Sequence, residues 1–337
     1  MEPDFPNQNN FCGGNFQDWL EVMLTPKCNG KCSWCIERNG FRPEKTATWM
    51  DMVDAILRFE RKHVLLLGGE PTLYKKLGQL VKTLSNCGIN VYITTNGSML
   101  TPRFVHENLE GLAGINISIH HYLLKKNLEV TGIDLSFLKL YGALKLLKGQ
   151  GTKVRLNCNL IKGYIDNKEA VSKYINYFAK PLLYVDNIRF AELKGTDGEF
   201  VDAAKLYDHK WGLNDDPFNL GCNIDTKLYG MPVNFRLMCG LQTKHRPKPN
   251  NPVQLDKVVL YYDGLFYAGW QIAEEDLKLM KSKKKTKALT IKQILKAVQD
   301  GKMSLVAAEK MIAKKKTKVI EKVEIIERGD AGGGCRY

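Results

Sequence analysis

Three cysteines near the amino terminus have the spacing of iron-sulfur ligands. Cys28, Cys32 and Cys35 stand in the run TPKCNGKCSWC, with the third thiol preceded by a tryptophan. A cubane 4Fe-4S cluster has four iron corners, and one tight loop reaches three of them, which leaves the fourth iron open to a small ligand. Zinc sites usually pair CxxC with a second such pair at a distance, and the sequence offers no partner pair. The spacing predicts a cluster with one open iron, and a zinc knuckle or three buried thiols are the alternatives.

A glycine-rich turn follows the next apolar run of strand length. It reads Gly68-Gly69-Glu70-Pro71-Thr72. Adjacent glycines let a ligand approach the backbone closely, and the proline fixes the turn so that carbonyl groups project in one direction. Such carbonyls can accept hydrogen bonds from an ammonium group. Alone, the run is an ordinary turn, but its position shortly after the cysteine loop supports a joint site.

The cysteine loop and the turn together resemble the radical S-adenosylmethionine (SAM) superfamily. The resemblance implies that the three cysteines hold a 4Fe-4S cluster whose open iron chelates the amino and carboxylate groups of SAM. Reductive cleavage of SAM, driven by an electron donor such as flavodoxin or ferredoxin, then yields a 5'-deoxyadenosyl radical. The resemblance assigns the SAM amino group to the turn formed by Gly68, Gly69, Glu70 and Pro71.

Polar residues at further strand ends complete the expected SAM pocket. The run TTNG at residues 94–97 matches a motif common in the family, and its alternative is a simple turn. On the next two apolar runs, polar residues alternate with apolar ones and would point into a barrel, although solvated strand faces show the same pattern. The expected contacts are Thr95, Asn96, Asn116, Ser118, Asn157 and Asn159.

Three titratable residues follow or end strands near the same expected site. His120 and His121 could bind substrate anions or move protons, but a capping or surface role is the favoured interpretation. Glu192 lies where the family often orients substrate. Its run RFAE resembles the RFIE run of the molybdenum-cofactor branch that rearranges GTP.

The order of apolar runs predicts the fold. Strand-length runs alternate with one-faced helical stretches, which is the βαβ rhythm of a parallel sheet. Right-handed crossovers wind such units into an open barrel whose loops at the strand carboxyl ends carry the chemistry. The expected strands are Trp19–Leu24, His63–Leu67, Asn90–Thr95, Gly114–Ile119, Lys153–Ile161 and Asn187–Leu193. The expected helices are Thr46–Arg61, Leu73–Asn86, Pro102–Leu112, Leu135–Lys148 and Asn167–Lys180.

The fold class is therefore α/β, a partial (β/α)6 TIM-like barrel with a small carboxyl-terminal α+β lobe and a basic helical tail. The lobe contains a strong hairpin signal around Asp263-Gly264. We expect four regions, namely an extension at 1–15, the barrel at 16–194, the lobe at 195–275 and the tail at 276–337.

The lobe resembles the twitch and SPASM extensions of the family, whose cysteines hold an auxiliary 4Fe-4S cluster. Cys222 and Cys239 match that pattern, but Ala268-Gly269-Trp270 stands where a cysteine is expected after the hairpin. Cys335 in the terminal tail is the remaining candidate for a third ligand. The alternatives are a lobe that has lost its metal, or Cys335 as a catalytic thiol resembling that of the rRNA adenine methyltransferases of the superfamily.

Composition limits the setting and the partners. The chain has 337 residues, is 44% hydrophobic, and shows neither a signal-like start nor an apolar run of membrane-span length. Nine cysteines favour a reducing cytosol and an oxygen-sensitive protein. Residues 278–322 hold 15 lysines against three acidic residues, so they carry most of the net charge of +14. This segment predicts either a solvated helical face or contact with nucleic acid or an acidic partner.

The leading functional prediction is a radical SAM enzyme that abstracts hydrogen from a C–H bond of a peptide or protein side chain. One alternative substrate is a nucleotide or a base in nucleic acid, which the lysine-rich segment would favour. The alternative outside enzymes is an iron-sulfur or zinc protein that binds nucleic acid. The GGEP turn argues against it, since such a protein needs no SAM pocket.

Overall fold

The computed structural model describes residues 19–35, 37, 42–180, 183–193, 198–206, 223–237 and 258–268. In these ranges ten strands form one continuous sheet in the order β10-β9-β1-β2-β3-β4-β5-β6-β8-β7. The first six strands along the chain pair in parallel with their sequence neighbours. They are β1 (Trp19–Met23), β2 (His63–Leu67), β3 (Asn90–Thr95), β4 (Gly114–Ser118), β5 (Lys153–Asn159) and β6 (Asn187–Ala191).

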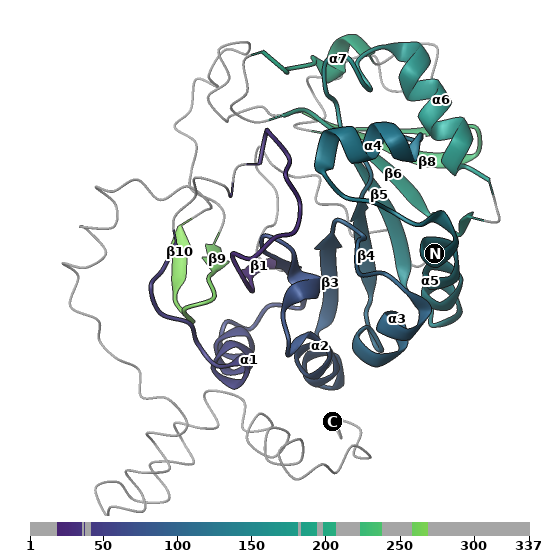
Figure 1. The fold of residues 1–337 in the computed structure, drawn as a ribbon. Helices are drawn as coiled ribbons and strands as arrows, with labels where there is room; N and C mark the ends of the chain where they lie inside the picture. The colour runs from purple at the N-terminus through teal and green to yellow at the C-terminus, as the bar shows by residue number, and fades with distance from the viewer. Residues whose placement is uncertain are drawn as a thin grey trace, which may run out of the picture.

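Helices connect these parallel strands. Figure 1 shows α1, α2, α3 and α5 arranged in that order along one side of the sheet, and each packs against the next. Among the described helices, none is long and apolar enough to cross a membrane. The helices are α1 (Trp49–Arg58), α2 (Leu77–Asn86), α3 (Pro102–Asn108), α4 (Leu124–Thr131), α5 (Phe137–Gly149), α6 (Lys168–Phe178) and α7 (Ala203–Leu206), with a 3-10 turn η3 (Pro71–Leu73).

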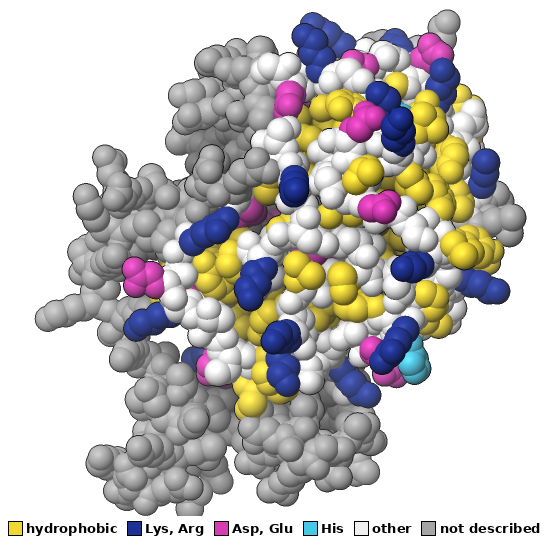
Figure 2. Space-filling view, in the orientation of Figure 1, with side chains coloured by type: hydrophobic (Ala, Val, Ile, Leu, Met, Phe, Trp, Pro, Cys, Tyr) yellow, Lys and Arg dark blue, Asp and Glu magenta, His cyan; other side chains and the backbone are white. Residues whose placement is uncertain are grey.

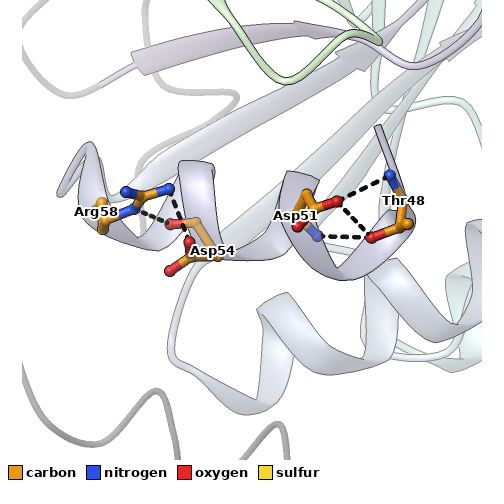
Figure 3. Close-up of polar contacts among 4 residues, drawn as sticks. All are labelled: Thr48, Asp51, Asp54 and Arg58. Atoms are coloured by element: carbon orange, nitrogen blue, oxygen red, sulfur yellow. Dashed lines mark hydrogen bonds and ion pairs between the residues drawn. The ribbon is translucent and has the colours of Figure 1, made fainter. Parts of the chain in front are cut away.

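Helix α1 shows why these segments are helical. Thr48 caps its start, because the Thr48 Oγ1 accepts from the Asp51 N–H at 3.2 Å and the Asp51 carboxylate accepts from the Thr48 N–H at 3.2 Å. An ion pair of 2.7 Å joins Arg58 to Asp54 one turn earlier (Figure 3). A capping box of this kind stabilises a helix by about 1 kcal/mol. The buried face of α1 consists of Met52, Val53, Ala55 and Ile56.

Along the central strands, side chains alternate between an apolar outer face and a polar inner face. Ile115, Ile117 and Leu156 pack in the main core and are at most 1% exposed. Full burial of such a side chain contributes about 1.5–3 kcal/mol. Asn116 and Arg155 point to the opposite face and are also buried, where they bond to each other. The sheet therefore has a hydrophobic layer under the helices and a polar interior.

Two antiparallel hairpins extend the sheet at its edges. Strand β9 (Val258–Leu260) pairs in parallel with β1 and antiparallel with β10 (Phe266–Ala268). Strand β8 (Met231–Arg236) pairs in parallel with β6 and antiparallel with β7 (Asn223–Leu228). The described parts of the range 195–275 thus include both edges of the barrel sheet, while the division of the chain into domains remains a prediction.

This architecture confirms the predicted α/β fold with a partial (β/α)6 barrel. Figure 2 shows one face of the described part, on which lysines and arginines are spread among apolar and uncharged atoms. The lysine-rich residues 278–322 and the extension at 1–15 lie outside the described residues, so the expectations placed on them stay predictions.

Candidate active site

The cysteine loop leaves the carboxyl end of β1. Cys28 is exposed, and Cys32 and Cys35 are half-buried. A Cβ atom at Gly30 would lie 3.5 Å from the Cys28 Sγ and 3.8 Å from the Cys32 Sγ, so these two sulfurs lie near the same stretch of backbone. The Cys35 N–H donates to the Cys32 carbonyl at 3.3 Å. The loop is compact and keeps its thiols near the surface.

The thiols of this loop influence one another. Partial burial of the Cys28 sulfur raises the pKa of that thiol; the Gly30 N–H opposes the rise, whereas the charges of Glu70 and Cys35 add to it. Three thiols on one short loop are the donor set that iron-sulfur clusters use. The chemistry of this donor set therefore fits a metal cluster.

In the described part of the chain, no three Cys, His, Asp or Glu side chains gather closely enough to hold one metal ion. A cubane binds each thiolate through a different iron corner, and the three cysteines have the CxxxCxxC spacing predicted for such ligands.

The GGEP turn packs directly against the cysteine loop. The Gly69 N–H donates to the Thr25 carbonyl at 2.8 Å, and the Glu70 N–H donates to the Lys27 carbonyl at 2.7 Å. A Cβ on Gly68 would lie 2.7 Å from the Thr25 oxygen, and one on Gly69 would lie 2.5 Å from the Lys27 oxygen. Both contacts exclude a larger side chain. The two glycines thus bring the turn and the cysteine loop together.

The Glu70 carboxylate joins the turn to the TTNG loop. It is 1% exposed and accepts four hydrogen bonds. Two come from the Thr72 N–H and hydroxyl, one from the Thr95 hydroxyl at 2.6 Å and one from the Asn96 N–H at 2.7 Å. The Glu70 side chain therefore positions two loops. The predicted contacts of SAM with the Glu70 backbone and with Pro71, which is buried beside it, remain predictions.

The TTNG loop in turn contacts the cysteine loop. The Asn96 Nδ2 donates to the Asn29 Oδ1 at 2.8 Å, and the Asn29 Nδ2 donates to the Ser98 Oγ at 2.9 Å. Three motifs far apart in the sequence therefore form one hydrogen-bonded group at the carboxyl ends of β1, β2 and β3. This is the juxtaposition that the predicted SAM pocket requires.

The polar residues predicted on β4 and β5 lie on the inner face of the sheet. The Asn116 amide is 2% exposed and bonds to the Thr94 hydroxyl at 3.1 Å. Ser118 lies opposite Asn157 in the strand register. The Asn157 Oδ1 is buried and has no hydrogen-bond partner among the described residues. An unsatisfied buried acceptor is costly, and an amino or hydroxyl group of bound SAM would satisfy it.

The two histidines after β4 serve the structure. The His120 Nδ1 accepts from the Asn159 N–H at 3.0 Å, so the neutral ring carries its proton on Nε2, and burial lowers the pKa of His120 to about 4. The His121 Nδ1 accepts from the Leu123 N–H at 2.9 Å. Burial and then the charge of Lys126 lower the pKa of His121, and the charge of Glu129 partly opposes this. Both rings accept hydrogen bonds from the backbone, as a capping role requires, but both are buried and not on the surface.

Glu192 follows β6 and is 2% exposed. Its Oε1 accepts from the Ala203 N–H at 2.8 Å, and its own N–H donates to the Arg236 carbonyl at 3.1 Å. The carboxylate holds the start of α7. Its expected role in orienting substrate stays a prediction.

A layer of arginines that was not predicted from the sequence lies on the inner face. The Arg155 Nε donates to the Asn116 Oδ1 on the preceding strand at 2.8 Å, and the Arg189 Nε donates to the Asn234 Oδ1 on the following strand at 2.8 Å. Arg189 also lies opposite Asn157 in the register. The alternation of side chains along β5 could have revealed this layer, because Arg155 is two residues from Asn157 and therefore lies on the same inward face of the strand.

The positive charges of the arginines in this layer repel one another and lower one another's pKa. Burial, followed by the charge of Arg236, lowers the pKa of Arg155 to about 9. Burial and then the charges of Arg155 and Arg236 lower the pKa of Arg189 well below its usual range, while Asp225 partly compensates. A guanidinium in water stays charged at any accessible pH, but burial among like charges makes the charged form costly here. An added negative charge would lower that cost further than Asp225 and, for Arg236, Glu21 already do.

A parallel barrel sheet with cysteine, glycine-rich and TTNG loops at its carboxyl edge defines the class of iron-sulfur enzymes that bind SAM. Residues 22–175 match the family model of the radical SAM superfamily, and this range contains the cysteine, GGEP and TTNG loops. Members use a 4Fe-4S cluster, SAM and an electron donor. The three candidate auxiliary cysteines, Cys222, Cys239 and Cys335, lie outside the described residues.

Individual relatives cover different shares of the chain. The chain is 32% identical over 188 residues to the molybdenum cofactor biosynthesis protein moc-5 of Caenorhabditis elegans. The matched region covers 53% of this chain and 31% of that protein. The chain is 24% identical over 254 residues to the GTP 3',8-cyclase of Aquifex aeolicus, and this match covers 73% of the chain and 71% of the cyclase. The chain spans 55% of the GTP 3',8-cyclase of Stenotrophomonas maltophilia strain K279a.

Solved structures share the fold. Streptococcus suis SuiB bound to its precursor peptide SuiA matches with a TM-score of 0.53 and 16% identity, covering 83% of this chain and 64% of SuiB. At that identity the match concerns the fold alone.

Proposed function

We propose that this protein is a radical SAM enzyme in which Cys28, Cys32 and Cys35 hold a 4Fe-4S cluster. When bound, the cluster and SAM supply a 5'-deoxyadenosyl radical that abstracts hydrogen from a substrate C–H bond. The observation that carries this proposal is the hydrogen-bonded group formed by the cysteine, GGEP and TTNG loops. These residues orient SAM beside the cluster, and the barrel excludes water from it.

We further propose an anionic substrate, with a nucleotide as the leading candidate. The inner layer of Arg155, Arg189 and Arg236 supports a negatively charged group next to the SAM pocket, because buried cations stabilise anions more strongly than exposed ones do. The relatives named GTP 3',8-cyclase support the same class. The peptide substrate favoured by the sequence has no comparable support, since the likeness to SuiB concerns the fold alone.

The proposal names a substrate class and not the reaction of GTP 3',8-cyclase. The chain covers only part of several such relatives, and the sequence places Ala268 where the twitch and SPASM pattern has a cysteine after the hairpin. The proposed setting is the reducing cytosol, with a flavodoxin or ferredoxin as electron donor.

Substrate dependence tests this assignment. The reconstituted enzyme is incubated anaerobically with SAM and dithionite, together with nucleoside triphosphates, the matching nucleosides, or peptides. We expect triphosphates to increase 5'-deoxyadenosine release above the substrate-free rate and the Arg189→Gln variant to abolish that increase. Stimulation by nucleosides or peptides that Arg189→Gln leaves intact would contradict an anionic substrate held by the arginine layer.

A further inference from the structure

Helix α4 contacts the cysteine loop between the first and second cysteines. The Lys31 N–H donates to the carbonyl of Thr131, the last residue of α4, at 2.7 Å. The last carbonyls of a helix have no partner inside that helix, so this bond satisfies one of them with the amide next to Cys32. The Lys31 side chain itself is exposed.

Gly132 permits this close approach. A Cβ at Gly132 would lie 3.1 Å from the Lys31 Cβ, a tight contact, whereas a Cβ at Gly30 would meet the Thr131 oxygen at an ordinary 3.6 Å. Gly132 also ends the helix in the left-handed conformation with φ 69°, which glycine adopts without steric cost. The helix end is thus fitted to the loop at this glycine.

The helix is anchored to the barrel by a buried amide. The Asn127 Oδ1 accepts from the His120 N–H at the end of β4 at 2.8 Å, and Asn127 is 1% exposed. The Thr131 hydroxyl donates back to the Asn127 carbonyl at 2.7 Å. A continuous path of hydrogen bonds therefore runs from β4 through α4 to Lys31.

Side-chain packing supports the same contact. Trp34, between Cys32 and Cys35, packs on a small apolar cluster that contains Val130 of α4, Ile161 and Leu193. The Trp34 ring also meets the His120 ring edge to face at 5.4 Å. The loop is thus held on both sides of Cys32, by the Lys31 hydrogen bond to α4 on one side and by the packing of Trp34 on this cluster on the other.

We propose that α4 is the positioning element of the cysteine loop, and that Asn127 and Gly132 are positioning residues which keep the loop in a cluster-binding shape before iron arrives. The GGEP turn fixes the loop at Thr25 and Lys27, ahead of Cys28. Helix α4 fixes the part that spaces Cys28 from Cys32. Preorganising a metal loop reduces the ordering cost that metal binding must otherwise offset.

The chain offers a matched control for Gly132. Gly151 follows α5, also has a positive φ, of 81°, and its Cβ would meet nothing within 4 Å. Gly132→Ala and Gly151→Ala therefore impose the same kind of backbone strain, and only the first also displaces Lys31. Asn127→Leu removes the acceptor for His120, whereas Asn127→Asp retains it.

The first readout is amide hydrogen exchange in the apo protein, which needs neither cluster nor activity. We expect the Lys31 amide of the wild type to exchange at least about tenfold more slowly than an unprotected amide. Gly132→Ala and Asn127→Leu should remove most of this protection, while Gly151→Ala and Asn127→Asp should keep it. An unprotected Lys31 amide in the wild type would overturn the proposal.

The second readout is iron per chain after anaerobic reconstitution and desalting. We expect Gly132→Ala and Asn127→Leu to retain about half of the wild-type iron or less, and the two controls to retain all of it. Equal iron in Gly132→Ala and Gly151→Ala, or no rescue by Asn127→Asp, would contradict a positioning role. Only the iron readout depends on the proposed function. If the Lys31 amide exchanges slowly but the chain binds no iron, that result would count against the cluster and not against the contact between α4 and the loop.

Discussion

The Asn96 N–H lies 2.7 Å from the Glu70 Oε2, and this bond connects the loops that follow β2 and β3. Asn96 then reaches the cysteine loop through Asn29. Glu70 is therefore a central hydrogen-bond acceptor of the candidate site, and its carboxylate connects the loops of the predicted SAM pocket.

Replacing Glu70 by glutamine should disrupt this arrangement. The amide nitrogen of glutamine can only donate, so one of the two backbone donors, the Thr72 N–H on Oε1 or the Asn96 N–H on Oε2, loses its acceptor inside a buried site. We expect a stability loss of about 1–3 kcal/mol and weaker SAM binding by the reconstituted protein. Urea unfolding and equilibrium dialysis measure the two effects. Glu107→Gln is the control, since Glu107 pairs with Arg103 on the surface of α3. Equal effects of both variants would contradict the special role of Glu70.

Gly69→Ala should displace the cysteine loop. Its Cβ would lie 2.5 Å from the Lys27 carbonyl oxygen, a distance that forces the backbone to move. We expect the variant to fold but to retain less iron after reconstitution. Gly149→Ala at the end of α5 meets nothing within 4 Å and should behave as the wild type. Full iron retention by Gly69→Ala would show that the close contact is not needed.

Anion binding by the arginine layer should weaken at high pH. The pKa of Arg155 is about 9, so its charge is present below pH 9 and is lost as the pH rises through that value. We expect the affinity for triphosphates to fall between pH 8 and 10 and Arg155→Gln to flatten that dependence. Fluorescence titration with a labelled nucleotide measures it. A profile that Arg155→Gln leaves unchanged would assign the dependence to another group.

His120 should make the apo protein less stable in mild acid. The pKa of His120 is about 4 in the folded protein, compared with 6.5 for an unperturbed histidine, so the unfolded chain binds the proton more tightly. The folded state is therefore fully stable above pH 6.5, and its free energy of unfolding decreases by up to about 3 kcal/mol as the pH falls towards 4. Urea unfolding of the apo protein at pH 7.5 and 5 tests this. His120→Gln should reduce the difference, and His106→Gln, at an exposed position of α3, should not.

Much of the barrel could be predicted from sequence, because strand and helix periods are local properties of a buried α/β unit. All six parallel strands lie where the apolar runs indicate. Helix α4 escaped prediction because it has only eight residues, lacks a side-chain N-cap and exposes Leu128 on its surface. The pairing of β9 with β1 was equally hidden, since it joins segments far apart in the chain.

The motifs of the candidate site were visible in sequence, but the role of several side chains was not. Glu70 belongs to the GGEP motif, but the hydrogen-bond partners of its side chain, Thr95 and Asn96, lie at the end of a different strand. Arg155 and Arg189 acquire their meaning only when the sheet brings β5, β6 and β8 together. Tertiary pairing of this kind leaves no local pattern.

The most direct test of the central claim is SAM cleavage. The protein is reconstituted anaerobically with iron and sulfide, and dithionite-dependent release of 5'-deoxyadenosine is measured for the wild type and for Cys32→Ala. We expect release by the wild type, with about four irons per chain from the predicted cluster, and none by the variant. A fully loaded wild-type protein that releases no 5'-deoxyadenosine with any nucleotide or peptide, or a Cys32→Ala variant as active as the wild type, would contradict a radical SAM mechanism at this loop.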